Sequence, residues 1–593
     1  MRILFITHAF NSLTQRLYSE LSARGHLLSI EFDIADSVAE EAVALFKPEL
    51  IVAPYLRRAI PESVWRRHTC LIVHPGIVGD RGPSALDWAI QGGECGKTAW
   101  GVTVLQAEAE MDAGPVWAAE TFALRAAKKS SIYRNEVTEA ATRAVLQAVE
   151  RYTEKSMAGG FVPAPLDYAD PAVRGELRPL IKQADRRIDW AIDSTASVLA
   201  KINAADGFPG LADTLFGEPC HLFDACDESG MLPGEPMFTR FSSHSPGAVL
   251  ARREGALLRK TVDGALWIGH VKRAGAAIAL KLPATQAFAD RLAEIPDLPL
   301  AGWWCAGGRT WQDIRYEEAG ASGQQVGFLH FDFYNGAMST RQCQRLQAAY
   351  EWARMRPTQV IVLMGGSDYW SNGIHLNTIE AAESPADESW ANINAIDDLA
   401  EAIIGSESQL TIAALQGNCG AGGCFLARAA DLVWARDGVL LNPHYKNMGN
   451  LFGSEYWTYL LPPRVGADGA RAIMQNRLPM TAADGVASGF LDACLTSDPA
   501  TFCAEVARRA AELAAAPDLT GRLQAKRERR AADEAAKPLA QYRAEELAQM
   551  RRNFYGFDPS YHVARFHFVH KSPNSWTPRH LAIHRELGWN VPK

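Results

Sequence analysis

A glycine-rich stretch in the second half of the chain limits the possible folds more than any other feature. An apolar run over residues 411–417 is followed by Gly420, Gly422 and Gly423, and residues 424–435 are then predicted to form a helix. Glycines at a strand-to-helix turn let a ligand approach the backbone, and the first N–H groups of a helix have no internal partner. We expect this turn to hold a thioester oxygen or an anion. A tight turn packed against a sheet is the alternative.

A second stretch upstream, VIVLMGGSDYWSNGIHL at residues 360–376, reads as a buried strand, a loop and the start of a helix. Together the two stretches resemble the crotonase, or enoyl-CoA hydratase/isomerase, superfamily over residues 326–495. The resemblance implies an oxyanion hole formed by the backbone N–H groups of Ile374 and Gly422. It also implies that coenzyme A binds at Ser371, Gly373 and Gly423.

The same region departs from the hydratase pattern at both catalytic glutamates. Phe425 stands in place of one glutamate, and His444 stands in place of the other. A hydratase needs two carboxylates to move a water proton and a carbon proton, so we do not expect hydration of enoyl-CoA. His444 and Tyr445 are the candidates for proton transfer, with Glu455 as a residue that orients one of them. A buried tyrosine with a satisfied hydroxyl is the alternative for Tyr445.

The first half of the chain predicts an open parallel sheet. Apolar strand-like runs alternate with amphipathic helical segments and lie at residues 2–7, 27–32, 49–53 and 70–73. The first turn lacks the Gly-x-Gly-x-x-Gly pattern, so dinucleotide binding there is unsupported. His74 follows the fourth strand. In open α/β sheets this carboxyl end is where ligands bind.

His74, the Arg81-Gly82-Pro83 loop and Asp112 after Gly-Val-Thr resemble the 10-formyltetrahydrofolate-dependent formyltransferases. The resemblance implies that Asp112 orients the His74 imidazole, which stabilises the tetrahedral intermediate and moves protons. The family's asparagine is replaced by Ile72, which counts against an amine acceptor and is compatible with a thiol. Folate binding is implied at Asp80, Arg81 and Gly82.

These motifs predict an α/β multidomain protein. The fold class comprises a Rossmann-like formyltransferase domain, a small β-barrel-like formyltransferase C-terminal domain and a crotonase-like domain. Asp189-Trp190 and Phe208-Pro209-Gly210 support the second of these. The predicted boundaries are a catalytic domain at 1–165, the barrel-like domain at 166–285, a connector at 286–320, the crotonase-like domain with C-terminal helices at 321–550 and a tail at 551–593.

Composition narrows the classes of partner. The formal net charge of −8 argues against nucleic acid or an anionic membrane surface. No apolar run is long enough for a spanning helix, and no signal peptide is recognised. The 10 cysteines contain no Cys-x-x-Cys pair, which predicts reduced thiols, a cytoplasmic location and no metal site. Three histidines of the tail, His562, His567 and His570, lack the cysteine or carboxylate framework of a metal site.

A formyltransferase joined to a modified crotonase domain resembles a family of [NiFe]-hydrogenase maturation factors. The resemblance implies a CO synthase that passes the formyl group of 10-formyltetrahydrofolate to coenzyme A and then converts formyl-CoA to CO and CoA. The CO would become a ligand of the hydrogenase iron. The implied ligands are tetrahydrofolate and CoA, and the implied protein partners are a hydrogenase large-subunit precursor or other maturation proteins.

Two other functions remain open at this point. One is an amine formyltransferase fused to an ordinary acyl-CoA hydratase or isomerase, against which Ile72 and the two missing glutamates count. The other is a non-enzymatic scaffold that binds CoA. Release of CO by the purified protein discriminates among the three.

Overall fold

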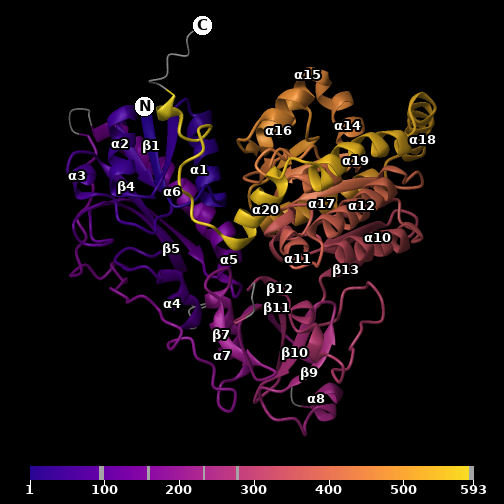
Figure 1. Ribbon diagram of the computed structural model, residues 1–593, viewed down its shortest axis with the longest axis horizontal. Helices are drawn as coiled ribbons and strands as arrows, with labels where there is room; N and C mark the ends of the chain where they lie inside the picture. Colours follow the sequence, from indigo (N-terminus) through magenta and orange to yellow (C-terminus); the bar gives the residue numbers. More distant parts are fainter. Residues whose placement is uncertain (93–98, 156–159, 232–233, 276–278, 587–593) are drawn as a thin grey trace.

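The structure is a computed structural model that describes residues 1–92, 99–155, 160–231, 234–275 and 279–586. Three parts are visible in Figure 1: an N-terminal α/β part in indigo and purple, a magenta β-rich part below it, and an orange and yellow part beside both. The predicted fold class is confirmed, since two formyltransferase-like parts precede a crotonase-like part. The boundaries at residues 165, 285, 320 and 550 remain predictions.

The first sheet is mainly parallel and is buried between helices. In spatial order its strands are β2 (Leu27–Phe32), β1 (Arg2–Thr7), β3 (Leu50–Ala53), β4 (Cys70–His74), β5 (Ala99–Gln106) and β6 (Val116–Ala123). Strands β2, β1, β3 and β4 are parallel, and β5 and β6 are antiparallel. Helices α1 (Ser12–Ala23) and α6 (Thr138–Lys155) cover one face, and α2 (Asp36–Phe46) covers the other. Burial on both faces explains the nearly continuous apolar runs.

The second sheet is antiparallel and open. Its main path contains β7 (Leu211–Leu215), β8 (Glu218–Asp227), β11 (Ala265–Arg273), β10 (Ala256–Lys260) and β9 (Val249–Arg253), and β12 (Lys281–Pro283) pairs with β11. Among the described residues no pairing joins β7 to β9, so the barrel-like part does not close. Helix α7 (Thr195–Ala205) packs Val198 and Ile202 onto this sheet.

The crotonase-like part contains a large and a small sheet. The large one runs β13 (Ile314–Ala319), β14 (Val326–Phe331), β15 (Val360–Leu363), β17 (Leu410–Leu415), β19 (Leu432–Arg436) and β22 (Ala493–Leu495), and the small one runs β16 (Tyr369–Ser371), β18 (Asn418–Gly420), β20 (Leu440–Asn442) and β21 (Met480–Thr481). Strands β15, β17 and β19 are each followed by one strand of the small sheet. The same turn therefore recurs at one edge, and it positions the loops of the site.

The helices of this part pack on both faces of the large sheet. Helices α10 (Thr340–Arg354) and α12 (Pro385–Ile404) share one apolar core with its strands, and α17 (Pro499–Ala514) belongs to the core on the opposite face. Helix α19 (Leu539–Tyr555) packs against α12. In the described residues no helix is both long and apolar enough to cross a bilayer.

One predicted helix is shorter than the sequence suggested. Helix α13 (Gly422–Arg428) ends seven residues before Ala435, and the following residues form β19. Strand β19 pairs in parallel with β17. Just before β19, the Asp431 carboxylate accepts the Thr411 N–H of β17 at 2.8 Å and so holds the start of β19 beside β17. Tertiary pairing thus overrides the helical preference of the alanine-rich run.

The C-terminal segment returns to the first sheet. After α20 (Ser560–His570), shown in yellow in Figure 1, the chain crosses to the N-terminal part. The N–H of Ile30 donates to the Leu581 carbonyl, and the buried His584 ring contacts Ser29 at 2.6 Å. Residues 587–593 of the predicted tail lie outside the described residues. The segment at 571–586, here termed the strap, therefore joins the crotonase-like part to the N-terminal part.

Candidate functional sites

The first candidate site lies at the carboxyl end of β4, where the buried ring of His74 faces two carboxylates. Nε2 of His74 lies 3.0 Å from Oδ1 of Asp80, and Nδ1 lies 3.4 Å from Oδ2 of Asp112. The structure therefore brings the predicted His74–Asp112 pair together. It also places Asp80, predicted to bind folate, closer to the ring than Asp112. Each ring nitrogen of His74 therefore faces a carboxylate.

The loops around His74 are tied to each other. A Cβ on Gly76 would lie 2.4 Å from His74 Nε2, so this position needs glycine. The Gly82 N–H donates to Oδ2 of Asp112 at 3.1 Å, and Arg81 Nε donates to a backbone carbonyl of the same neighbouring loop at 2.9 Å. Arg81 and Gly82, predicted to bind folate, thus hold the Asp112 loop against the loop that follows β4.

The second candidate site is formed by the two glycine loops of the crotonase-like part. Among the hydrogen bonds of the described residues, none uses the N–H of Ile374 or Gly422 as a donor. Gly373 has a φ of 76°, and a Cβ there would lie 3.2 Å from the Gly422 nitrogen. The predicted donors are therefore adjacent and unpaired. Ser371 supports this loop, because its Oγ accepts the Gly373 N–H at 3.1 Å.

The residue before α13 has an unusual backbone. Ala421 has φ 46° and ψ −128°, and its N–H donates to the Asn442 carbonyl of β20 at 2.9 Å. A Cβ on Gly423 would lie 2.3 Å from the Ser371 carbonyl oxygen, so the two loops touch at this point. Strained backbone conformations of this kind cluster at functional sites.

Tyr445 and Glu455 form a buried pair beside the glycine loops. Tyr445 Oη donates to Glu455 Oε2 at 2.5 Å, and Glu455 Oε1 lies 2.0 Å from the position of a Cβ on Gly422. The Phe425 ring stacks on Tyr445 with centroids 5.7 Å apart. Burial, and then the Glu455 charge, raise the pKa of Tyr445 well above its usual value. Burial, and then Asp397, raise the pKa of Glu455.

The structure does not bring His444 into this pair. Both ring nitrogens of His444 are buried and have no hydrogen-bond partner among the described residues. Burial, followed by the charges of Arg477 and His580, lowers the pKa of His444 to about 4. The hydroxyl of Tyr445 and the carboxylate of Glu455 are thus the predicted groups that meet at the glycine loops.

Two further carboxylates adjoin Glu455 and were not predicted from the sequence. Asp397 of α12 accepts the Glu455 N–H at 2.8 Å, and Glu546 of α19 accepts the Tyr456 N–H at 3.0 Å. The sequence did contain an indication of both residues, because each acid interrupts an otherwise apolar stripe of its helix. Asp397 lies four residues after Ile393, and Glu546 lies four residues before Met550.

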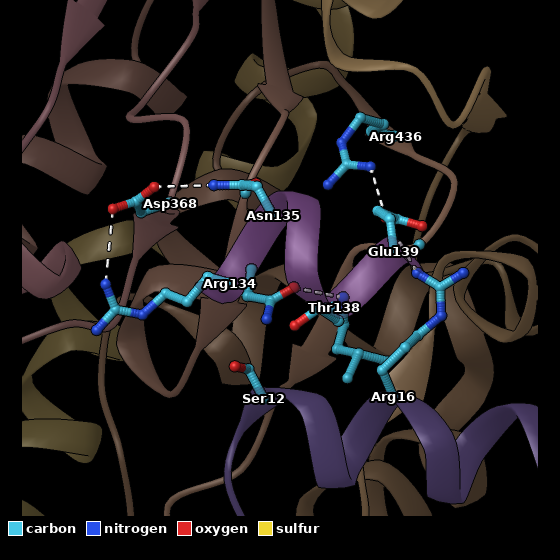
Figure 2. Close-up of a pocket in the computed structure, with 12 residues that line it drawn as sticks. Ser12, Arg16, Arg134, Asn135, Thr138, Glu139, Asp368 and Arg436 are labelled. Carbon is cyan, nitrogen blue, oxygen red and sulfur yellow. Dashed lines mark hydrogen bonds and ion pairs between the residues drawn. The ribbon is translucent and has the colours of Figure 1, made fainter. Parts of the chain in front are cut away.

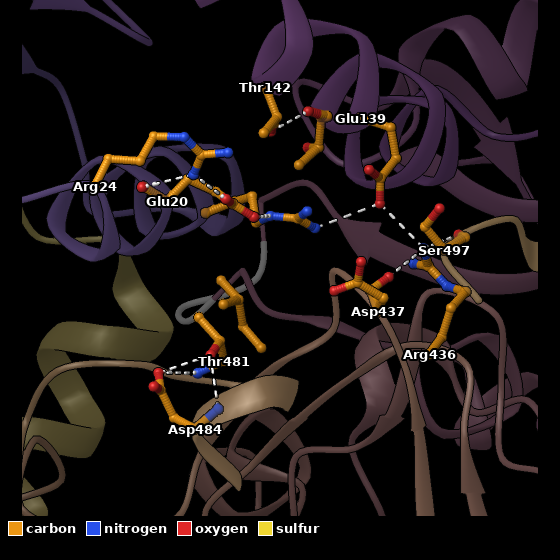
Figure 3. A network of polar contacts seen from close by, with 12 residues as sticks. Glu20, Arg24, Glu139, Thr142, Arg436, Asp437, Thr481, Asp484 and Ser497 are labelled. Atoms are coloured by element: carbon orange, nitrogen blue, oxygen red, sulfur yellow. Dashed lines mark hydrogen bonds and ion pairs between the residues drawn. The ribbon is translucent and has the colours of Figure 1, made fainter. Parts of the chain in front are cut away.

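The N-terminal part meets the crotonase-like part through polar side chains. Asn135 Nδ2 donates to Asp368 Oδ1 at 3.0 Å, and Arg134 lies 3.6 Å from the same carboxylate, as Figure 2 shows. In Figure 3, Arg436 Nη1 donates to Glu139 at 3.0 Å. Gln15, at the start of α1, accepts from Asn442. Helix α1 follows β1 directly, so the carboxyl edge of the first sheet faces the crotonase-like part.

Three family models match the chain. The enoyl-CoA hydratase/isomerase model matches residues 333–577, the formyl transferase model matches residues 31–149, and the model of the formyl transferase C-terminal domain matches residues 180–281. A methionyl-tRNA formyltransferase of Roseiflexus castenholzii is 29% identical over 250 residues, which cover 41% of this chain and 71% of that protein.

Two relatives match essentially the whole chain. The hydrogenase maturation factor HoxX of Bradyrhizobium diazoefficiens is 54% identical over 585 residues, or 99% of this chain and 97% of that protein. The crystal structure of HypX from Aquifex aeolicus, in complex with tetrahydrofolic acid, superimposes with a TM-score of 0.92 at 44% identity and covers 100% of both chains.

Proposed function

This chain belongs to the HoxX family of hydrogenase maturation factors, and on that premise we propose that it makes carbon monoxide in two steps. The first step transfers the formyl group of 10-formyltetrahydrofolate to coenzyme A. The second converts formyl-CoA to CO and CoA. The observation that carries the proposal is the Tyr445–Glu455 pair, which lies beside the N–H groups of Ile374 and Gly422. Neither N–H group makes a hydrogen bond among the residues that the structure describes.

In the first step the His74 site moves one proton. The thiol of CoA loses its proton, sulfur attacks the formyl carbon, and the bond from that carbon to N10 of the folate breaks as N10 takes a proton. His74 carries the proton, and Asp80 and Asp112 hold its ring in place. The tetrahydrofolate in the HypX crystal structure supports folate as the donor.

The strand that carries His74 supports a thiol as the acceptor of the formyl group. Ile72 lies two residues earlier on β4 and so on the same face as His74, where formyltransferases that act on amines carry an amide. Its apolar side chain packs against the core of the first part. A thiolate is a stronger nucleophile at neutral pH than a protonated amine, so a thiol acceptor needs less help from the site.

The second step moves the formyl proton from carbon to sulfur. The C–H and C–S bonds break, the carbonyl leaves as CO, and the proton ends on the CoA sulfur, so no electron donor or acceptor is needed. The N–H groups of Ile374 and Gly422 polarise the formyl oxygen. Glu455 takes the proton through the Tyr445 hydroxyl, and the same pair returns it to sulfur. The raised pKa of Glu455 suits a base at neutral pH.

Phe425 keeps hydrolysis of formyl-CoA from competing with CO release. Its ring occupies the hydratase glutamate position and lies flat on Tyr445, and it is fully buried. Water excluded from this wall cannot attack the formyl carbon to give formate. In a maturation factor the released CO would serve as the ligand of the [NiFe]-hydrogenase iron, with a hydrogenase large-subunit precursor as the receiving partner.

CO release by the purified protein tests the proposal. The protein is mixed with 10-formyltetrahydrofolate, with and without CoA, and CO is read by haemoglobin absorbance. We expect CO only when CoA is present. A formylated amine or a hydrated enoyl-CoA in its place would support two uncoupled activities. Tight CoA binding without turnover would indicate a scaffold.

A further inference from the structure

The turn that carries Glu455 has an unfavourable backbone. Glu455 and Tyr456 both have a φ of 59°, in the left-handed region that side chains other than glycine seldom adopt. Side chains are strained in this region, and here two such residues occur in succession. Neighbouring groups must therefore hold the turn. The candidates are the side chains that bind its backbone.

Asp397 binds the turn from helix α12. Its Oδ1 accepts the Glu455 N–H at 2.8 Å, and its Oδ2 accepts the Ser454 hydroxyl at 2.7 Å. The side chain is completely buried. Within the described part of the chain the nearest cation is Arg543, whose Nε lies 4.0 Å from Oδ2 and whose other nitrogens bind Asp398 and Glu401. Asp397 thus serves the turn, and its charge is only weakly compensated.

Glu546 binds the same turn from helix α19. Its Oε2 accepts the Tyr456 N–H at 3.0 Å, and its Oε1 accepts the Thr458 N–H at 2.8 Å and the Thr458 hydroxyl at 2.5 Å. Oε2 also lies 3.4 Å from Ser454 Oγ, the hydroxyl that contacts Asp397. One hydroxyl proton serves a single acceptor at a time, so Ser454 links the two carboxylates.

The turn directs the two oxygens of Glu455 to different groups. Oε2 accepts the Tyr445 hydroxyl and the Ser454 N–H at 3.2 Å. Oε1 has no hydrogen-bond partner among the described residues and lies 2.0 Å from the position that a Cβ on Gly422 would occupy. One oxygen is thus bound to tyrosine, and the other is free beside the oxyanion loop. A rotation of the turn by a single residue would break this arrangement.

We propose that Asp397 and Glu546 are positioning residues of the decarbonylation site, which hold Glu455 in this geometry and share protons with it. The inference rests on the proposed function. Three buried carboxyls within one hydrogen-bonded cluster cannot all be charged, since like charges repel strongly in a medium of low polarity. A proton kept by a neighbour leaves Glu455 free to act as the base.

The shared protons predict a pH dependence. Burial raises the pKa of Glu546 to about 8, and burial also raises the pKa of Asp397 and Glu455. Activity of a carboxylate base rises with pH through its pKa, which sets the acid limb of the rate profile. The titratable and charged groups that face the three carboxyls are Tyr445, Tyr456, Cys343, Cys424, Asp398, Glu401 and Arg543.

Asp397→Asn tests the proposal in the full-length protein with supplied formyl-CoA. Because the protons are shared, Asp397 carries a negative charge in part of the population, and loss of that charge lets Glu455 lose its proton more readily. The acid limb of CO release therefore shifts down by about one pH unit. The plateau rate falls about tenfold, because Asn Nδ2 cannot accept the Ser454 hydroxyl. Asp397→Glu, which restores the charge, returns the limb toward the wild-type position. A purely structural role would lower the rate without moving the limb.

The matched control is Asp387→Asn, the same change near the start of α12. Asp387 is exposed and binds Tyr555 at 2.7 Å, so we expect an unchanged profile. An unmoved limb and rate in Asp397→Asn would overturn the inference while wild-type CO release upheld the proposed function. Absence of CO release from formyl-CoA by the wild type would overturn both.

A second variant and a measurement on the wild type remain informative if Asp397→Asn fails to fold. In Glu546→Gln the side-chain NH2 group would face a backbone N–H group of the turn, where neither can accept a hydrogen bond. We expect a lower rate of CO release together with a downward shift of the acid limb. Infrared spectra of the wild-type protein should show protonated buried carboxyls that lose their C=O stretch between about pH 6 and about pH 9. No such band at about pH 6 would contradict proton sharing.

Discussion

The two candidate sites differ in the elements that supply their residues: loops at one sheet edge for the first, and separate helices and loops for the second. His74, Asp80 and Asp112 lie within a few loops at one edge of one sheet. The Tyr445–Glu455 pair is held by Asp397 and Glu546, which come from two separate helices. The first site is therefore determined by local turns. The second depends on the packing of α12 and α19 against the glycine loops.

The two sites also differ in the balance of charged groups. At the first, two carboxylates surround one imidazole, which can carry a positive charge. At the second, three carboxyls share one hydrogen-bonded cluster, and one of them, Glu455, accepts a tyrosine hydroxyl. Among the described residues the nearest cation is Arg543, 4.0 Å from Asp397. A histidine with two acids suits transfer of nitrogen-bound and sulfur-bound protons. A buried carboxyl with a raised pKa suits removal of a proton from carbon.

His74→Ala gives the largest expected separation of the two sites. We expect formyl transfer to CoA to fall about 10³-fold, because the group that carries the proton is lost. CO release from supplied formyl-CoA should stay within about twofold, since the second site lies in another part of the chain. Both rates are measured on the same preparation by formyl-CoA chromatography and haemoglobin absorbance.

His26→Ala is the control for that variant. His26 lies in the turn before β2, at the opposite end of the sheet from His74, and we expect both rates to be unchanged. A loss of CO release from supplied formyl-CoA in His74→Ala would show that one set of residues serves both reactions.

Tyr445→Phe is expected to reverse the pattern with a smaller effect. CO release should slow about 10²-fold while formyl-CoA accumulates, because Glu455 loses its hydrogen-bonded relay to the substrate. Formyl transfer should be unaffected. The matched control is Tyr350→Phe, a buried tyrosine whose hydroxyl contacts Ser406 at 2.5 Å. An unchanged CO yield in Tyr445→Phe would remove this residue from the site.

The difference between the sites also explains what the sequence could predict. His74, Asp112, Ile374 and Gly422 belong to short motifs whose spacing is set by one turn, and the structure brings each pair together. Asp397 and Glu546 have no motif, since their partners are backbone groups more than fifty residues away. Only their position on apolar helix stripes marked them.

His444 and the helix after Gly422 show why local sequence patterns are not sufficient to predict a structure. His444 is adjacent to Tyr445 in sequence, but burial, followed by the charges of Arg477 and His580, lowers the pKa of its ring. The run after Arg428 is alanine-rich, yet it pairs with β17 as a strand. In both cases residues distant in sequence decide the outcome, and a single sequence does not show which distant residues meet.

Gly422→Ala tests the contact between the oxyanion loop and Glu455. A Cβ there would lie 2.0 Å from Glu455 Oε1, so the carboxylate must move. We expect CO release to fall about tenfold, because a base displaced by an ångström loses its alignment. Gly521→Ala is the control, since a Cβ at this helical glycine meets nothing within 4 Å. Formyl transfer should be unchanged in both variants.

Glu31→Gln in the strap contact has the smallest expected effect on turnover. Glu31 Oε2 contacts the His584 ring at 3.0 Å and accepts from Arg585 at 2.5 Å, and Thr577 also donates to Glu31. Burial alone would raise the pKa of Glu31, but these hydrogen bonds outweigh it and lower the pKa below its usual 4.5. Among the described residues, the strap residues that bind Glu31 make no hydrogen bond to His74, Tyr445 or Glu455. Both rates should therefore stay within about twofold, while stability falls by about 3 kcal/mol.

The pH dependence of that stability loss follows from the lowered pKa. A carboxyl with a depressed pKa in the folded state stabilises the fold above its unfolded pKa, and this contribution is lost as pH falls through the folded value. Thermal unfolding of the wild type and Glu31→Gln should therefore differ at neutral pH and converge below about pH 4. Glu41→Gln is the control, because Glu41 is exposed and accepts a hydrogen bond from Nη1 of the same Arg585. A neutral-pH difference equal to that of Glu41→Gln would mean that the strap contact does not stabilise the fold.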